Sequence, residues 1–366
     1  MFTKNINFKS YFYKKRQKLN SKILNILKKL LNEKSEILKS LGSHYVSSYD
    51  KKILKKYKYK NEITLIGMGG SILGAKAIYQ FLKPKVKKFF FVDYFKNSPK
   101  KNINQKNQLN LIISKSGNTL ETISNSNILI KKKQTNILIT DNKNSYLLEL
   151  ANKLKAEIVN HNALIGGRYS VLSEVGMLPA EMMGFSAKKF RRLNVLIKDK
   201  IFISKLISNV SDILRLIKKK KTNSIILNYD KNSDALFSWY QQLIAESLGK
   251  KGNGILPLIS SMPKDNHSLM QYYLDGPKNN FFTLFFVKEK FSDKIKRDDL
   301  IKSHYYLKNK NLSDISFSQF LATEKVFKRK NIPFRSFIIN KRNEETIGDL
   351  FIFFILETIL LGRAMN

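Results

Sequence analysis

Short apolar runs alternate with longer amphipathic stretches through most of the chain. In the first half, four such runs are rich in Ile, Leu, Val and Phe, and helix-type patterns separate them. Short, continuously apolar strands are typical of a parallel sheet that is covered on both faces. The predicted strands are Glu62–Gly67, Lys88–Asp93, Leu109–Ser114 and Asn136–Thr140, and the predicted helices begin near Ile72 and cover Leu120–Lys133 and Val171–Met183.

The same alternation repeats in the second half, after a predicted long helix that ends near Lys220. The pattern indicates two successive α/β units, each doubly wound around a parallel sheet. The predicted strands here are Ser224–Asn228, Ile255–Leu258, Phe281–Val287 and Phe334–Ile339, with helices over Asp234–Leu248 and from about Glu345.

The first 58 residues carry a different signal. An apolar stripe that includes Ile23, Leu27 and Leu30 predicts helices before the first strand. We therefore expect three parts: an N-terminal helical segment over residues 1–58, a first α/β domain over 59–184, and a second over 185–366. A length of 366 residues suits two domains at roughly 100–200 residues each.

Composition excludes several classes of site. The chain has no cysteine, which excludes disulfides, thiolate metal centres and a cysteine nucleophile. Its four histidines, His44, His161, His267 and His304, are scattered and predict no metal centre. The stretch Met1–Lys18 lacks the apolar core of a signal peptide, and Leu350–Leu361 is too short to span a membrane and contains Glu357. We expect a cytoplasmic protein without a membrane partner.

The net charge of +39 raises the possibility of a nucleic-acid binder, which we keep as an alternative. The lysines are spread over the whole chain, however, and Lys, Asn and Ile are the residues of AT-rich codons, so genome composition explains the excess. Even Lys51–Lys60, which interleaves basic and aromatic residues, is more typical of a solvated helix surface. We expect no nucleic-acid partner, and a positive field that attracts a small anionic substrate.

A glycine turn follows the first predicted strand, with the sequence Gly67-Met-Gly-Gly-Ser71 before a helix. Free backbone N–H groups and the helix dipole can hold an anion there. The dinucleotide fingerprint fails because Ile72 stands at its third glycine position, although Asp93 could serve as its ribose-binding acid. A plain strand–helix turn and a sugar-phosphate site are the other interpretations.

A second polar turn, Ser114-Lys-Ser-Gly-Asn-Thr119, follows the third predicted strand and precedes another helix. Its hydroxyls could wrap a phosphate, or Ser116 or Thr119 could simply cap the helix. Two such turns at the carboxyl ends of strands in one sheet favour the phosphate, because ligands bind there in open α/β folds.

Three later motifs complete a pattern that resembles the glucose-6-phosphate isomerase family, whose domains have the sugar isomerase (SIS) fold. They are Gly166–Ser173, Gln242–Lys250 and Asp265–Gln271, in that order after the two turns. The resemblance covers roughly residues 60–366. It implies two SIS domains and the reversible conversion of glucose 6-phosphate into fructose 6-phosphate, without metal or organic cofactor.

The resemblance also implies roles for single residues. Glu246 matches the base that moves a proton between C2 and C1, and Gln242, one helical turn before it, would contact substrate hydroxyls. Arg168 matches the arginine beside the developing enediolate. His267 matches the ring-opening histidine, which reaches the active site from the neighbouring subunit and so implies a homodimer with shared sites. Ordinary structural roles are the alternative for each.

The remaining implied contacts concern the sugar phosphate. Gly70 and Ser71 would touch it, Gly167 would let the backbone approach the sugar, and Lys115 occupies the family's lysine position in the second turn. The phosphate itself would be held by Ser114, Ser116 and Thr119.

The resemblance breaks after the last predicted helix. The family continues into an Asn-Pro-Phe-Asp-Gln-Pro motif and a helix with a lysine, whereas this sequence stops at Asn366. We therefore expect a truncated sequence with weakened activity. Two related alternatives remain: a bifunctional phosphoglucose/phosphomannose isomerase, and a non-catalytic SIS protein that binds sugar phosphates.

Overall fold

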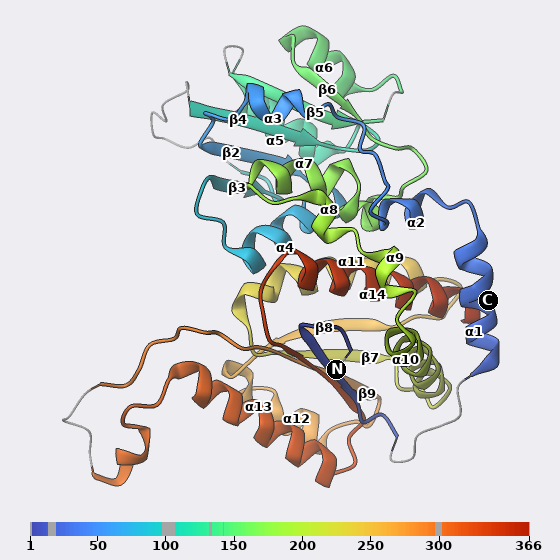
Figure 1. The fold of residues 1–366 in the computed structure, drawn as a ribbon, viewed down its shortest axis with the longest axis vertical. Coiled ribbons are helices and arrows are strands. Elements are labelled where there is room, and N and C mark those ends of the chain that lie inside the picture. The colour runs from blue at the N-terminus through green and yellow to red at the C-terminus, as the bar shows by residue number, and fades with distance from the viewer. Residues whose placement is uncertain are drawn as a thin grey trace.

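Two five-stranded sheets lie at the two ends of an elongated molecule, with helices between them (Figure 1). The structure is a computed structural model that describes residues 2–13, 20–96, 107–131, 134–141, 143–296 and 302–365. The α/β class with two parallel sheets is confirmed.

The first sheet is entirely parallel and has the strand order β3-β2-β4-β5-β6. Gly67 lies opposite Ile113 in the register of β2 and β4, so these two strands end at the same edge. The strands are β2 (Glu62–Gly67), β3 (Lys88–Val92), β4 (Gln108–Ile113), β5 (Thr135–Thr140) and β6 (Glu157–Asn160).

The second sheet has the order β1-β10-β9-β7-β8, and only its edge strand β1 is antiparallel. Its strands are β1 (Ile6–Ser10), β7 (Asn223–Asn228), β8 (Leu256–Ser261), β9 (Asn280–Val287) and β10 (Phe334–Ile339).

The helices cover both sheets and fill the space between them. They are α1 (Ser21–Asn32), α2 (Glu36–Ser40), α3 (Lys52–Lys56), α4 (Leu73–Leu82), α5 (Leu120–Leu129), α6 (Tyr146–Leu154), α7 (Glu174–Met182), α8 (Ala187–Phe190), α9 (Leu193–Leu196), α10 (Lys200–Lys218), α11 (Asp234–Leu248), α12 (Met270–Asp275), α13 (Leu312–Arg329) and α14 (Glu344–Met365). Short 3₁₀ turns include η1 (Gly69–Ser71), η3 (Gly167–Leu172) and η5 (Lys264–Asn266).

The N-terminal part departs from the helical prediction. Residues 21–32, 36–40 and 52–56 are helical, but residues 6–10 form β1. In β1, Ile6 and Phe8 are buried and pair with Ile339 and Phe337 of β10. An alternating segment becomes a strand when a sheet edge is available, and here that edge comes from the other end of the chain.

Two predicted helices also differ from those observed. The helix expected over Leu120–Lys133 ends at Leu129, and residues 132–133 lie outside the described part. The expected long helix up to Lys220 is divided into α8, α9 and α10.

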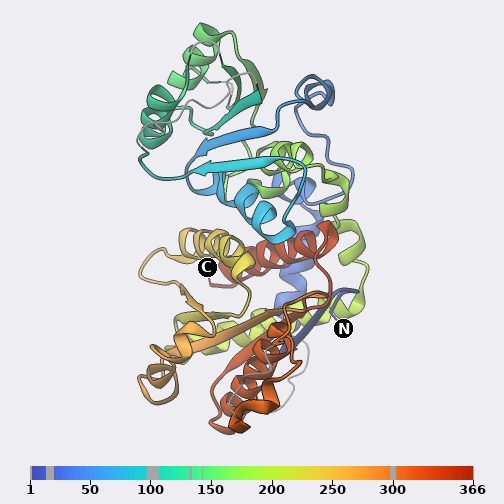
Figure 2. The same ribbon diagram turned by 90° about the vertical axis from the view of Figure 1, so that its left-hand side faces the viewer.

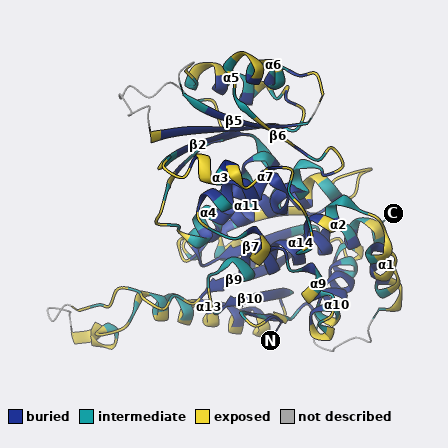
Figure 3. Ribbon diagram, turned by 45° about the horizontal axis from the view of Figure 1, so that its top comes forward, coloured by how far each residue is buried: buried dark blue, intermediate teal, exposed yellow. Residues whose placement is uncertain are grey.

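The central layer consists of α4, α11 and α14, which pack against one another between the sheets (Figures 1 and 2). Figure 3 shows this layer and the strands as the buried part of the molecule, whereas the outer helices carry exposed faces. Nearly every residue of α14 up to Leu361 is buried. The prediction of a buried helix there is confirmed, and no helix in the described ranges is long and apolar enough to cross a membrane.

Candidate active site

The first glycine turn is packed tightly onto the segment that carries Arg168. A Cβ on Gly70 would lie 2.2 Å from the carbonyl carbon and oxygen of Gly167, so only glycine allows η1 and η3 to approach this closely. Ser170 reinforces the contact by donating to the carbonyl oxygens of both glycines. The first turn and the segment Gly166–Ser173 thus form one unit, with Gly70 and Ser170 in contact although 100 residues separate them in sequence.

The second turn closes on itself through its end hydroxyls. The Oγ of Ser114 and the Oγ1 of Thr119 are 2.8 Å apart. Gly117 has a φ of +66°, and a Cβ there would lie 2.2 Å from the Oγ of Ser145. Ser116 Oγ accepts from the N–H of Asn118. The loop is therefore held in shape from within and by the start of α6.

Both helices that follow these turns begin without a side-chain cap. Thr119 is the N-cap residue of α5, but its hydroxyl bonds to Ser114 instead of the helix, so ordinary capping by Thr119 is wrong. Within the described residues, no side chain caps α4 either. Elsewhere in the described part of the chain, Ser145 caps α6 and Asp199 caps α10, whereas α11 and α13 also begin without a side-chain cap. Uncapped N–H groups with a positive helix end favour an anion.

The two turns lie at the same edge of the first sheet. They follow β2 and β4, which are neighbours with Gly67 opposite Ile113. Lys115 spans to the next loop, because its Nζ donates to the carbonyl oxygen of Ala163 at 2.6 Å. A single site formed by Ser71 and the second turn requires both turns to lie at one edge of the sheet, and they do.

A carboxylate on α11 faces this edge. Glu246 accepts from Nη1 of Arg168 at 2.5 Å and from Nε2 of Gln242 at 3.1 Å. Gln242 in turn lies against Gly69, where a Cβ would come within 2.8 Å of its Nε2. The predicted i,i+4 pair on α11 is therefore observed, and it meets both η1 and η3.

The exposure of these groups suits a reactive site. The Glu246 side chain is 50% exposed and that of Arg168 is 21% exposed. The carboxylate is thus held in place on one side and open on the other.

Two residues of this cluster had no role in the sequence prediction. Ser247 accepts from Nε of Arg168 at 2.8 Å and lies 2.8 Å from the hydroxyl of Tyr169. Ser247 thereby fixes the orientation of the guanidinium. Ser247 directly follows Glu246, and Tyr169 directly follows Arg168, inside the two motifs that contain those residues. Their position in these motifs is the signal that could have identified them.

His267 lies elsewhere in the chain's own fold. It follows η5 after strand β8 of the second sheet, and its side chain is exposed. In the described part of this single chain, no hydrogen bond or ion pair joins it to Glu246. Asp265 anchors its loop, since it accepts from Ser260 Oγ and the N–H of Ser261. Burial opposes ionisation of Asp265, but these bonds prevail and lower its pKa.

Other candidate groups are engaged in structural contacts. Asp93, which the dinucleotide interpretation required, forms an ion pair with Lys76 at 2.6 Å. His161 is buried against Glu174, with Nδ1 and Oε1 2.9 Å apart. No group of three or more His, Asp or Glu in the described ranges could hold a metal ion.

Comparison with known proteins identifies the family. A family described as phosphoglucose isomerase matches residues 32–255. A glucose-6-phosphate isomerase of Methanocaldococcus jannaschii is 32% identical over 340 residues, which cover 86% of this chain and 82% of the relative. The chain belongs to the phosphoglucose isomerase family. The resemblance inferred from the five motifs is thereby confirmed.

Solved structures agree with the family assignment in fold. A hypothetical protein of Thermus thermophilus superposes with a TM-score of 0.81 at 21% identity, covering 98% of this chain and 94% of that one. A glucose-6-phosphate isomerase of Chlamydia trachomatis gives 0.66 at 18% identity, covering 96% and 72%. The two-sheet SIS architecture is thus the expected one for a phosphoglucose isomerase.

Proposed function

We propose that the chain catalyses the reversible isomerisation of glucose 6-phosphate to fructose 6-phosphate. The observation that supports this most strongly is the Glu246 carboxylate, which Arg168 of η3 and Gln242, packed on Gly69 of η1, hold by hydrogen bonds. Family membership supports the same reaction, since the curated relatives are named glucose-6-phosphate isomerases.

In this proposal the two turns bind the phosphate. Ser71 approaches it from the first turn, while the second turn supplies hydroxyl and backbone donors; its residues are Ser114, Lys115, Ser116 and Thr119. The amino ends of α4 and α5 add a favourable dipole. Gly70 lets η1 pack directly against η3, and Gly167, whose missing side chain would meet only the Cα of Gly70, leaves room for the sugar.

Glu246 is the proposed base. It removes the proton from C2 of the open-chain sugar, which gives a cis-enediolate with negative charge on O1. The proton of the C2 hydroxyl is transferred to O1, and the same carboxyl returns the carbon-bound proton to C1, which leaves a ketone at C2. Gln242 contacts substrate hydroxyls and holds one carboxylate oxygen of Glu246, while Arg168 holds the other. The guanidinium of Arg168 lies where negative charge develops on the enediolate oxygens, so it stabilises the transition state more than the substrate.

A direct assay tests the proposal. Purified protein should convert fructose 6-phosphate into glucose 6-phosphate, followed by a coupled dehydrogenase that oxidises only glucose 6-phosphate. No product under conditions in which fructose 6-phosphate binds would favour a non-catalytic binder. Equal turnover of mannose 6-phosphate would favour the bifunctional alternative.

We also propose that His267 opens the sugar ring from the neighbouring subunit of a homodimer in the cytoplasm. An exposed histidine without a link to Glu246 in the described part of its own chain is consistent with a role across an interface. An imidazole can both donate and accept a proton, which ring opening requires.

Mixed dimers test this arrangement. Glu246→Gln and His267→Ala chains, each inactive alone, should regain activity when unfolded together and refolded, because a heterodimer contains one intact site. Refolding each variant with itself is the control. If heterodimers form, as shown by tagged copurification, and no activity returns, the shared site is wrong.

A further inference from the structure

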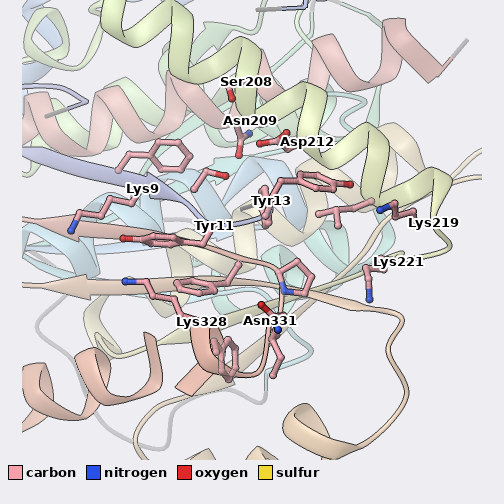
Figure 4. A pocket seen from close by; sticks show the side chains of 18 of the residues that line it. Lys9, Tyr11, Tyr13, Ser208, Asn209, Asp212, Lys219, Lys221, Lys328 and Asn331 are labelled. Carbon is pink, nitrogen blue, oxygen red and sulfur yellow. The ribbon is translucent and has the colours of Figure 1, made fainter. Parts of the chain in front are cut away.

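A large cavity lies away from the candidate active site, against the edge of the second sheet. Its volume is about 710 Å³, and it is bounded by β1 and residues 11–13, by α10, and by the turn from α13 into β10 (Figure 4). None of the candidate active-site residues lines it. The volume lies in the range of roughly 300–1,000 Å³ that is typical of small-molecule sites.

The lining of this cavity is strongly cationic. Among the described residues that form it, the only carboxylate is Asp212, which Arg215 pairs at 3.4 Å. Behind the lining, Glu324 lies 3.8 Å from the Nζ of Lys328. The cationic residues of the lining are Lys9, Lys205, Lys219, Lys221 and Lys328. A concave surface with charge of one sign concentrates ions of the opposite sign.

Two tyrosines separate the lysines into two ends (Figure 4). The Nζ of Lys328 lies 4.1 Å above the ring of Tyr11, and the Nζ of Lys219 lies 5.3 Å above that of Tyr13. Lys9 joins the first end, and Lys221 joins the second in the view of Figure 4. A molecule that spans the tyrosines would therefore meet ammonium groups at both of its ends.

Like charges crowd the second end. Burial lowers the pKa of Lys221, and the positive charges of Lys278 and Lys219 lower it further. The Nζ of Lys221 donates to the carbonyl oxygen of Lys278, which does not neutralise it. A bound anion would relieve this repulsion.

We propose that this cavity is a second anion-binding site that takes a small metabolite with a phosphate group at each end, such as a sugar bisphosphate. Each phosphate is held by one pair of lysines, and the sugar lies in the cavity between the two pairs. A monophosphate satisfies only one end and binds at least tenfold more weakly. This site is separate from the isomerase site and does not depend on its reaction.

Calorimetric titration with fructose 1,6-bisphosphate tests the proposal. The protein is first saturated with fructose 6-phosphate, so that the candidate active site is filled. A further binding event, near one per chain, is expected at low salt, and it should weaken as salt screens the lysines. Inorganic phosphate should not reproduce it. Absence of this event overturns the proposal.

Paired variants localise the event. Lys219→Gln/Lys328→Gln removes one cation from each end and should weaken bisphosphate binding at least tenfold. Lys55→Gln/Lys58→Gln removes the same charge from an exposed surface near α3 and should leave it unchanged. An unchanged circular dichroism spectrum and melting midpoint show that both variants fold. If both double variants bind the bisphosphate equally well, or are weakened to the same extent, the ligand binds outside this cavity.

Discussion

Two arginine–glutamate pairs lie on opposite sides of α11 and differ in their surroundings. Arg168 and Glu246 are 21% and 50% exposed, whereas Arg335 and Glu357 are completely buried. The first pair lies where α11 meets η1 and η3, in the candidate active site. The second lies within the protein core.

The partners of the buried pair explain the difference. Asn209 donates to Glu357, and the Tyr240 hydroxyl on α11 donates to it as well. Burial raises the pKa of Tyr240, and Glu357 raises it further, so the hydroxyl stays protonated as a donor. These bonds fix α11 against β10 and α14. The same pair of residue types thus holds the helix in place on one side and remains open to a substrate on the other.

A third pair has an intermediate environment. Arg192 is 22% exposed, but its partner Asp349 is only 2% exposed. A fourth pair, Arg363 and Glu33, joins α14 to the residue after α1 and is exposed at 37% and 44%. Variants of these four ion pairs can therefore test whether the effect of losing a pair depends on its exposure to solvent or on its place in the candidate active site.

The largest expected effect is on turnover, when the pair of Arg168 and Glu246 in the candidate active site is changed. Glu246→Gln keeps the shape and loses the base, so turnover should fall by about 10²–10⁴-fold or more, while thermal stability changes little. The matched control is Glu33→Gln, which removes a carboxylate of similar exposure, 44% against 50% for Glu246, from an arginine pair. It should leave both turnover and the melting midpoint unchanged. Near-normal turnover of Glu246→Gln would remove Glu246 from the mechanism.

The next largest effect is expected for stability at the buried pair. Arg335→Met leaves the Glu357 carboxylate buried without its cation, which should cost about 3–5 kcal/mol of unfolding free energy. Urea denaturation measures it.

Arg335→Met/Glu357→Leu is the control for this pair. Replacing both charges should recover most of the lost stability, because apolar substitutes avoid the desolvation cost of a buried pair. A double variant no more stable than the single one would contradict this account of the pair.

A smaller, pH-dependent effect is expected at the intermediate pair. Burial raises the pKa of Asp349 to about 6, although Arg192 opposes the shift. The unfolded carboxyl titrates near roughly 3.9. Between these values the folded state binds more protons, so the contribution of Asp349 to stability falls as pH rises.

The variant Asp349→Asn removes this titration. The stability of the natural protein minus that of the variant should therefore fall by about 2–3 kcal/mol between about pH 4 and pH 7. Urea denaturation at several pH values measures the difference. A difference that stays constant or rises with pH would show that Arg192, and not burial, controls the carboxyl.

The elements with local signals were well predicted from the sequence. β2, α11 and β10 have the predicted bounds, because apolar runs and helical periodicity are properties of each segment alone. β1 was missed because it depends on pairing with β10. The helix α13 was also missed, although its buried Phe320 and Phe327 have helical spacing.

The candidate site was predictable as a set of motifs but not as an arrangement. The sequence indicated that Gln242 and Glu246 share a helix face. It could not indicate that Arg168 donates to Glu246, since 78 residues separate them. Likewise, Glu357 predicted a buried helix rather than a membrane span, but its partner Arg335 becomes apparent only when α14 packs on β10. Long-range partners follow from tertiary packing, which local patterns do not specify.

The central claim, that the open carboxylate of Glu246 moves the substrate proton, is tested most directly by proton exchange in D₂O. Glucose 6-phosphate is incubated with each variant, and NMR follows deuterium entry at C2. The natural protein and Glu33→Gln should introduce deuterium at C2, while Glu246→Gln should not, even where it still binds the sugar phosphate. Deuterium entry with Glu246→Gln at the rate of the natural protein would contradict the account.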